Sequence, residues 1–306
     1  MVRLSSRALL LGAALLLPLS ACDETSALTE GTVEQQVINA RIARQGGDYD
    51  AAVRILEQAY AASPSHPAVR VEYGVTVLER NQIDLLDLDR IAQYLSSVTG
   101  SKTVARTPVL PASARGVVCT YENDPDATPF SPTDYADFPT LQANRAALQQ
   151  ALTLLDPVIP DALQSFDLCT SIVDGPDGRP MLRYETQAAL DELRALGLSD
   201  TEISAALATN ALARFLNAFL FLTDDLPQQT AWYRVDGGTS IGVCAEDPDA
   251  LADQAQEAIQ DMGEALFSID LRARTFGTTS TSQELVDLVL QSYEDVRDGV
   301  ADYCGQ

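Results

Sequence analysis

Basic side chains are scarce in this sequence. Of its 306 residues, 20 are Lys or Arg and 44 are Asp or Glu, which gives a formal net charge of −24. Lys102 is the single lysine, so arginine carries nearly all of the positive charge. Such a chain repels nucleic acid, and we expect no nucleic-acid partner. Because the acids are spread along the whole chain, we favour adaptation to a saline habitat over the alternative, an acidic surface for a basic partner or for cations.

Histidine and the common catalytic motifs are also lacking. His66 is the only histidine and lies between Ser65 and Pro67, where it is typical of a helix start. The sequence has no Gly-rich phosphate loop, no nucleophile elbow and no HExxH motif, and its acidic groups do not fit the EF-hand spacing. We therefore expect no cofactor, no metal and no catalysis. A hydrolase that uses two carboxylates remains the alternative, although nothing in the sequence selects a pair.

The N-terminus has the layout of an export signal. Arg3 and Arg7 precede an uncharged run, Leu9–Leu19, and the segment ends in Leu-Ser-Ala-Cys at residues 19–22. These four residues resemble the lipobox of bacterial lipoproteins. The resemblance implies removal of residues 1–21 and acylation of Cys22, palmitate included. An ordinary signal peptide or a membrane anchor are the alternatives, but the run is short for a spanning helix.

The lipobox resemblance also implies a location. The mature protein would be held at a bacterial membrane through the lipid alone and would face the periplasm or the cell exterior. Residues 22–32 are small and polar, as in a tether between lipid and fold. Asp23 follows the acylated cysteine, but its meaning differs between bacterial groups, so inner and outer membrane both stay open.

Four further cysteines predict two disulfides, because an even number in an exported chain favours pairing. They are Cys119, Cys169, Cys244 and Cys304. Three pairings are possible. We favour Cys119–Cys169 with Cys244–Cys304, since each bond then closes a loop within one part of the chain. Zinc is disfavoured by the absence of a CxxC spacing and of nearby histidine.

Apolar spacing predicts helices over residues 33–45 and 49–62, and a third from Pro67. The run Gly-Asp-Tyr-Asp-Ala-Ala-Val at residues 47–53, followed by Ala59 and Pro64, resembles the second half of a tetratricopeptide (TPR) unit. With the 34-residue length of this repeat, Gly74 occupies the position in the second unit that Ala40 occupies in the first. The resemblance covers residues 33–98 as two helical pairs and implies a surface that binds a protein or peptide. Two repeats are fewer than a stable solenoid needs, so the pair should dock on the rest of the chain.

The remaining chain predicts further helices and little or no β structure. Residues 99–140 are rich in proline and should form an irregular loop, and residues 141–306 should form a helical domain. Helices are expected at 141–155, 160–173, 184–196, 200–222, 248–276 and 282–304, with a small hairpin or an ordered loop over 232–235 and 241–244. The helix at 200–222 is nearly apolar all round. We expect it to be a core helix, because Arg214 near its centre would make a membrane span costly.

The fold class expected is therefore all-α, a TPR-like helical array extended by further hairpins. The function expected is a non-catalytic scaffold or binding lipoprotein of the cell envelope, which holds a protein, a peptide or a small ligand in a helical groove. In outline the chain resembles TPR lipoproteins that accompany TRAP-type transporters, which implies a transport-accessory role as the alternative. Five residues are candidate binding residues: Arg70, Tyr73, Trp232, Tyr233 and Arg234.

Overall fold

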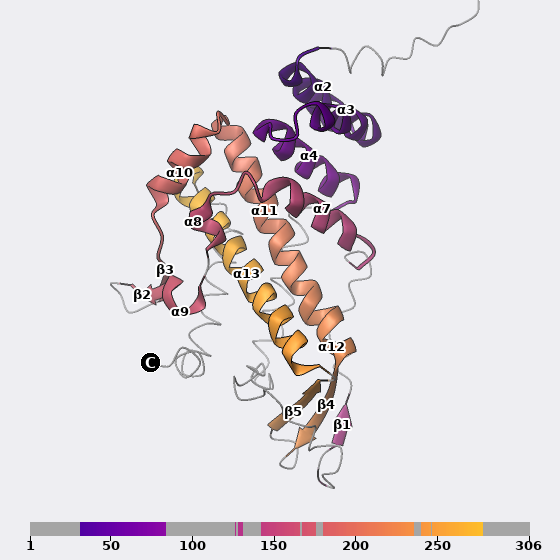
Figure 1. Ribbon diagram of the computed structural model, residues 1–306, viewed down its shortest axis with the longest axis vertical. Helices are drawn as coiled ribbons and strands as arrows, with labels where there is room; N and C mark the ends of the chain where they lie inside the picture. Colours follow the sequence, from indigo (N-terminus) through magenta and orange to yellow (C-terminus); the bar gives the residue numbers. More distant parts are fainter. Residues whose placement is uncertain are drawn as a thin grey trace, which may run out of the picture.

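The computed structural model describes residues 31–83, 126, 128–130, 142–165, 167–175, 180–235, 240–245 and 247–277. In these parts the chain is an all-α array, with two small antiparallel sheets at its edges (Figure 1). The predicted signal peptide, the acylated Cys22, most of the tether and the helix expected at 282–304 lie outside them. The boundaries predicted for those segments stay predictions.

The N-terminal helices follow the TPR expectation. They are α2 (Val33–Gln45), α3 (Tyr49–Ala62) and α4 (Pro67–Arg80). Gly47 makes the turn between the first two with φ of +82°, a conformation that favours glycine. Asp48 then caps α3 by accepting from the backbone N–H of Ala51 at 3.0 Å. Three alanines are fully buried and let the helices approach closely: Ala40, Ala52 and Ala59.

Helix α4 forms its next hairpin with a helix that lies far along the sequence, α7 (Arg145–Leu155). The amide of Asn144, just before α7, donates to the carbonyl of Asn81, just after α4, at 2.9 Å. At the other end Arg70 donates to the last carbonyls of α7. The two helices are therefore antiparallel. Between them a Cβ on Gly74 would lie 3.2 Å from Cγ of Leu155, so this glycine permits close contact.

Two long helices form the centre of the molecule, α11 (Asp200–Leu220) and α13 (Pro248–Phe276), which lie side by side (Figure 1). Helix α11 begins with the expected capping box of Ser199 and Glu202. Its length and composition would allow a membrane span, but 72% of its most apolar 18-residue window is buried inside the protein. This burial agrees with a core helix.

An ion-pair network fixes the TPR-like helices to α11. Glu72 of α4 is 3% exposed and accepts from Arg41 at 2.9 Å and from Arg44 at 2.7 Å, both on α2. Arg41 also reaches Glu202 in the first turn of α11 at 3.2 Å. The carboxylate of Glu72 thus has two guanidinium partners, as a buried charge requires.

One predicted helix is wrong. Residues 160–173 form two short helices, α8 (Asp161–Gln164) and α9 (Leu168–Ser171), and the chain then continues into strand β2 (Ile172–Asp174). Strand β2 pairs with β3 (Pro180–Leu182). The β-branched residues Ile172 and Val173 favour a strand, which the apolar spacing alone did not reveal. Helix α10 (Thr186–Ala195) follows close to its predicted bounds.

The expected hairpin is present as β4 (Thr230–Val235) and β5 (Ser240–Ala245). A π-helix, η4 (Phe221–Asp225), and α12 (Leu226–Gln229) connect α11 to it. The region predicted as an irregular loop contributes an unexpected edge strand, β1 (Thr128–Phe130), that pairs with β4. Pro129 is tolerated there because an edge strand has one side without a pairing partner.

Candidate functional site

A stripe of polar residues lies along the contact between α11 and α13. On α11 the stripe contains Asn210, Arg214 and Asn217, whose spacing of four and three residues places them on one helix face. On α13 the stripe contains Asp261, Glu264 and Ser268, whose spacing of three and four residues also places them on one helix face. Because the two helices pack along their length, the two stripes meet in an otherwise apolar core.

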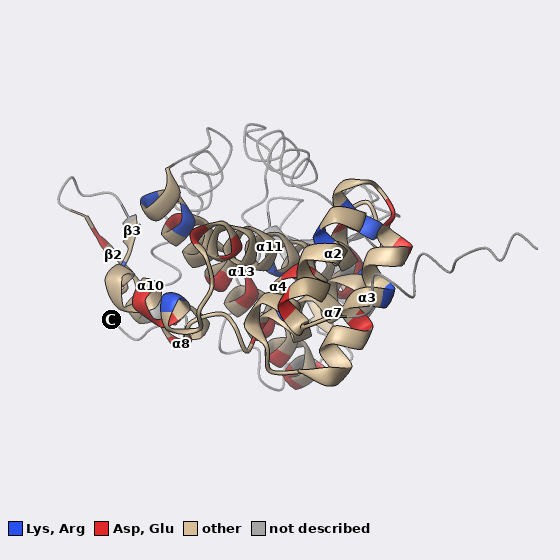
Figure 2. Cartoon of the chain, turned by 90° about the horizontal axis from the view of Figure 1, so that it is seen from above, with Lys and Arg blue, Asp and Glu red and all other residues tan. Residues whose placement is uncertain are grey.

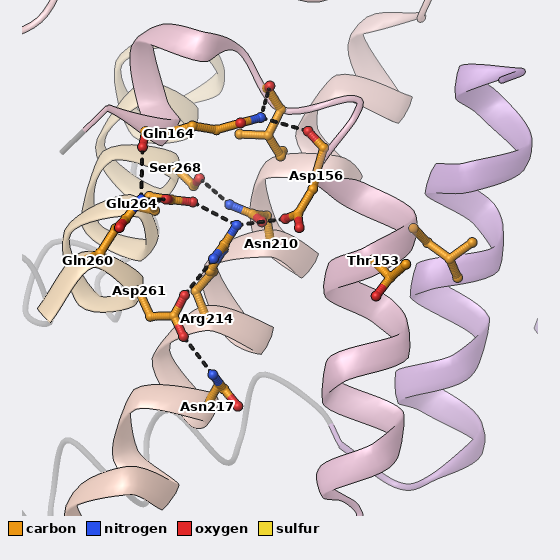
Figure 3. Close-up of polar contacts among 12 residues, drawn as sticks. Thr153, Asp156, Gln164, Asn210, Arg214, Asn217, Gln260, Asp261, Glu264 and Ser268 are labelled. Atoms are coloured by element: carbon orange, nitrogen blue, oxygen red, sulfur yellow. Dashed lines mark hydrogen bonds and ion pairs between the residues drawn. The ribbon is translucent and has the colours of Figure 1, made fainter. Parts of the chain in front are cut away.

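The guanidinium of Arg214 is the centre of this stripe (Figure 3). Its Nη1 lies 2.5 Å from Oδ1 of Asp261, and its Nη2 lies 2.6 Å from Oδ1 of Asp156. Oε2 of Glu264 lies 2.9 Å from the same Nη2. We call these four residues the Arg214 cluster. It combines one positive and three negative formal charges from α11, from α13 and from the end of α7.

Uncharged side chains hold the carboxylates in place. Asn217 donates to Oδ2 of Asp261 at 2.6 Å, and Gln260 donates to Oε1 of Glu264 at 3.1 Å. One turn away Asn210 donates to Oγ of Ser268 at 2.9 Å. Among the described residues, Oε2 of Glu264 has its ion pair with Arg214 but no hydrogen bond. The carboxylate of Glu264 is therefore the least well satisfied of the three.

The three carboxylates differ in burial. Glu264 is 1% exposed, whereas the side chain of Asp156 is about half exposed. Burial raises the pKa of Glu264 to about 7, although Arg214 opposes the shift. Burial also raises the pKa of Asp156, again against Arg214. For Arg214 burial lowers the pKa, but its acidic neighbours outweigh burial and leave the pKa raised, so this side chain stays charged.

A cavity of about 440 Å³ opens beside the cluster. Acidic and amide side chains from α7, α11 and α13 form most of its wall, and one guanidinium reaches it. The lining residues are Gln149, Leu152, Thr153, Asp156, Arg214, Asn217, Glu257, Gln260 and Asp261. The cavity is open to solvent and its wall is mostly polar, unlike the enclosed, mainly apolar pockets that bind most small molecules. The excess of acids suits a ligand group that is positively charged and donates hydrogen bonds.

The described residues contain no group of three or more His, Cys, Asp or Glu side chains arranged to hold a metal ion. Three carboxylates are close enough to share Arg214, but the guanidinium occupies the space between them. The chemistry that this arrangement offers is exchange of a proton at Glu264 and attraction of a basic group to the cavity.

Arg70 and Tyr73, two of the predicted binding residues, face the interior. Tyr73 is 6% exposed, and its hydroxyl accepts from Gln150 of α7 at 3.2 Å. The guanidinium of Arg70 lies 5.3 Å from the ring centroid of Tyr60 and binds the last carbonyls of α7. Both side chains thus join α4 to its neighbours, and the groove expected beside them is filled by α7.

The other predicted residues lie on β4 or beyond the described parts. Trp232, Tyr233 and Arg234 are consecutive residues of strand β4, which pairs with β5. Cys244 of β5 is disulfide-bonded. Its partner is not among the described side chains, and the pairing of Cys119, Cys169 and Cys304 stays a prediction.

Sequence reasoning did not identify the Arg214 cluster. The available signal was an arginine flanked by two asparagines on one face of an apolar helix. The arginine makes a membrane span costly, and it also indicates a buried charge that needs partners. Nothing in the sequence pointed to Asp156, Asp261 and Glu264 among 44 acidic residues. Figure 2 shows how widely acidic residues are distributed over the helices.

Neither a comparison with curated proteins nor one with solved structures gives a significant match. A protein-family model does match part of the chain. It is the tetratricopeptide repeat, over residues 43–84, which span the end of α2, all of α3 and all of α4. This segment of the chain therefore carries a tetratricopeptide repeat, and the protein is a TPR-like helical array.

Proposed function

We propose that this protein is a non-catalytic scaffold, anchored by a lipid on Cys22 to a bacterial envelope membrane, that binds a protein or peptide partner. The observation that carries the proposal is the tetratricopeptide match at residues 43–84, because repeats of this kind commonly mediate protein–protein contacts. The lipobox-like residues 19–22 support the anchor. A TRAP-type transporter is one candidate partner within this proposal.

The chemistry of the partner follows from the cavity beside the Arg214 cluster. Asp156, Glu257 and Asp261 line it against one arginine, and the whole chain has a net charge of −24. A lysine or arginine side chain on the partner would gain charge-assisted hydrogen bonds there. Long-range attraction would also speed its association at low ionic strength. We propose that the partner presents a basic side chain to this cavity.

Site-specific photo-crosslinking in cells tests this proposal. A photoreactive amino acid at Thr153, which is exposed on the cavity wall, is expected to give a covalent adduct with one partner. The same probe at Gln187, which is exposed on α10 away from the cavity, should not give this adduct. Adding Asp156→Asn and Glu257→Gln should weaken the Thr153 adduct. Equal adducts from both positions would refute binding at the cavity.

The anchor has a separate test. Metabolic labelling with a palmitate analogue should mark the wild-type protein, and Cys22→Ser should abolish the label and release the protein from the membrane fraction. Ser26→Ala in the tether serves as the matched control and should leave both unchanged. An unlabelled wild-type protein would contradict lipidation without affecting the binding proposal.

A second candidate function, hydrolysis by two carboxylates, is favoured by one observation. Asp156 and Glu264 both have a raised pKa, and they flank Arg214 beside a cavity. Enzymes often hold such pairs to donate and accept protons. Here Arg214 binds both groups directly, which favours binding over catalysis. Turnover of a glycoside or ester substrate that is lost in Glu264→Gln would reverse this preference.

A further inference from the structure

The Arg214 cluster contains more negative charge than one guanidinium can balance. Asp261 and Asp156 already occupy Nη1 and Nη2 of Arg214 at 2.5 and 2.6 Å. Glu264 is a third carboxylate, and it approaches the same Nη2 at 2.9 Å. If all three were ionised, two negative charges would remain in a site where Glu264 is 1% exposed. Uncompensated charge in a buried site is costly, so an extra proton is favoured there.

Glu264 is the carboxylate best suited to hold that proton. Within the described parts of the chain, its Oε2 contacts Arg214 but makes no hydrogen bond, whereas Asp261 accepts from Arg214 and from Asn217. Among the described residues, the charged groups that face Glu264 are Arg214 of α11, Asp156 after α7 and Asp261 on its own helix. The nearby residue of α8 is Gln164, whose backbone carbonyl accepts from Gln260. No second cation from these elements compensates Glu264.

Because the Arg214 cluster lies between three helices, the proton on Glu264 affects how firmly these helices are held together. The same four residues join α13 to α11 and to the end of α7, three elements that are far apart in the sequence. The cavity reaches Asp156, Arg214 and Asp261, so water can exchange protons beside the buried carboxylate. We propose that the Arg214 cluster is a proton-dependent link, which holds α13 to α11 and α7 more tightly when Glu264 is protonated than when it is ionised.

The direction of the pH effect follows from the pKa of Glu264, which rises from 4.5 to about 7 in the folded protein. Below pH 4.5 the carboxyl is protonated in the folded and the unfolded chain. Between pH 4.5 and 7 the unfolded chain loses the proton while the folded chain keeps it, so stability falls as the pH rises. Above pH 7 this contribution is constant, and the link is at its weakest.

The test compares the wild type with Glu264→Gln by urea unfolding at pH 5.5 and pH 8. The amide cannot ionise, so the variant lacks this pH dependence, and acids outside the Arg214 cluster cancel in the ratio. The ratio of the wild-type to the variant unfolding constant is expected to rise about thirtyfold between the two pH values. Glu257→Gln, seven residues earlier on α13 and exposed, is the matched control and should give a ratio that changes less than threefold.

A second measurement detects the proton directly and does not depend on the stability of the variant. Carbon-13 NMR of labelled glutamate carboxyls in the wild type should show one resonance that titrates near pH 7 and is missing from Glu264→Gln. Hydrogen exchange of amides in α13 should become faster over the same pH interval, after correction for intrinsic rates. A Glu264 resonance that titrates below pH 5.5, or equal pH profiles for wild type and variant, would overturn the proposal.

Discussion

Replacing Arg214 by alanine is expected to lower the free energy of unfolding by about 3 kcal/mol at pH 7.5. The substitution leaves Asp156, Asp261 and Glu264 without their common cation. Removing one partner of a buried ion pair typically costs about 3–5 kcal/mol. We expect the low end because the side chain of Asp156 is about half exposed and screened by water. Chemical denaturation followed by circular dichroism measures the change.

Arg80→Ala is the control for the loss of an arginine. Arg80 pairs with Asp50 at 2.8 Å, but both side chains are largely exposed, so we expect a change below about 1 kcal/mol. Adding Glu264→Gln to Arg214→Ala should recover at least about 1 kcal/mol, since it removes one of the uncompensated charges. A loss below about 1 kcal/mol for Arg214→Ala alone would mean that the cluster is well solvated.

Replacing Leu155 by alanine is expected to lower the free energy of unfolding by about 3 kcal/mol. Leu155 is fully buried in the core between α7 and α4. Removing the outer atoms of a buried leucine loses their transfer free energy and leaves a cavity, and such changes cost about 2–5 kcal/mol. The same urea titration at pH 7.5 provides the measurement.

A second substitution shows whether the loss arises at the contact with α4. A Cβ on Gly74 would lie 3.2 Å from Cγ of Leu155 and 3.5 Å from each Cδ, so Gly74→Ala is crowded in the wild type. In Leu155→Ala those atoms are gone, and the new methyl group can occupy part of their space. Gly74→Ala should then be more favourable by at least about 1 kcal/mol than in the wild type. Helix propensity cancels in this comparison. Additive effects would mean that the two residues are not in contact.

The sequence predicted the N-terminal helices well because their signals are local. Gly47 at the turn, Asp48 at the cap and Pro67 at a helix start each act within a few residues. The capping box at Ser199 identified the start of α11 for the same reason. The family match over residues 43–84 agrees with the resemblance found from this local pattern.

The features that the sequence did not reveal depend on contacts between distant segments. Arg214 stands out in an apolar helix, but its partners Asp156 and Asp261 lie 58 and 47 residues away, and no spacing rule connects them. Tyr73 resembled a groove residue because the helix that covers it, α7, begins more than 70 residues later. Both gaps have one cause. Helical periodicity identifies the buried face of a helix, and it does not identify the helix that covers this face.

The antiparallel hairpin of α4 and α7 bears on how the protein can be divided into fragments. A protein that ends at residue 98 would keep the whole family match but would lack Leu155 and the rest of the surface that buries α4. We expect such a fragment to remain unfolded or to aggregate, although its repeat sequence is complete. Conversely, Asn81 and Asn144 are held together by a hydrogen bond, so the stretch between them begins and ends at one place. Related chains with a longer or shorter stretch between these two positions are therefore expected to keep the same stack of helices.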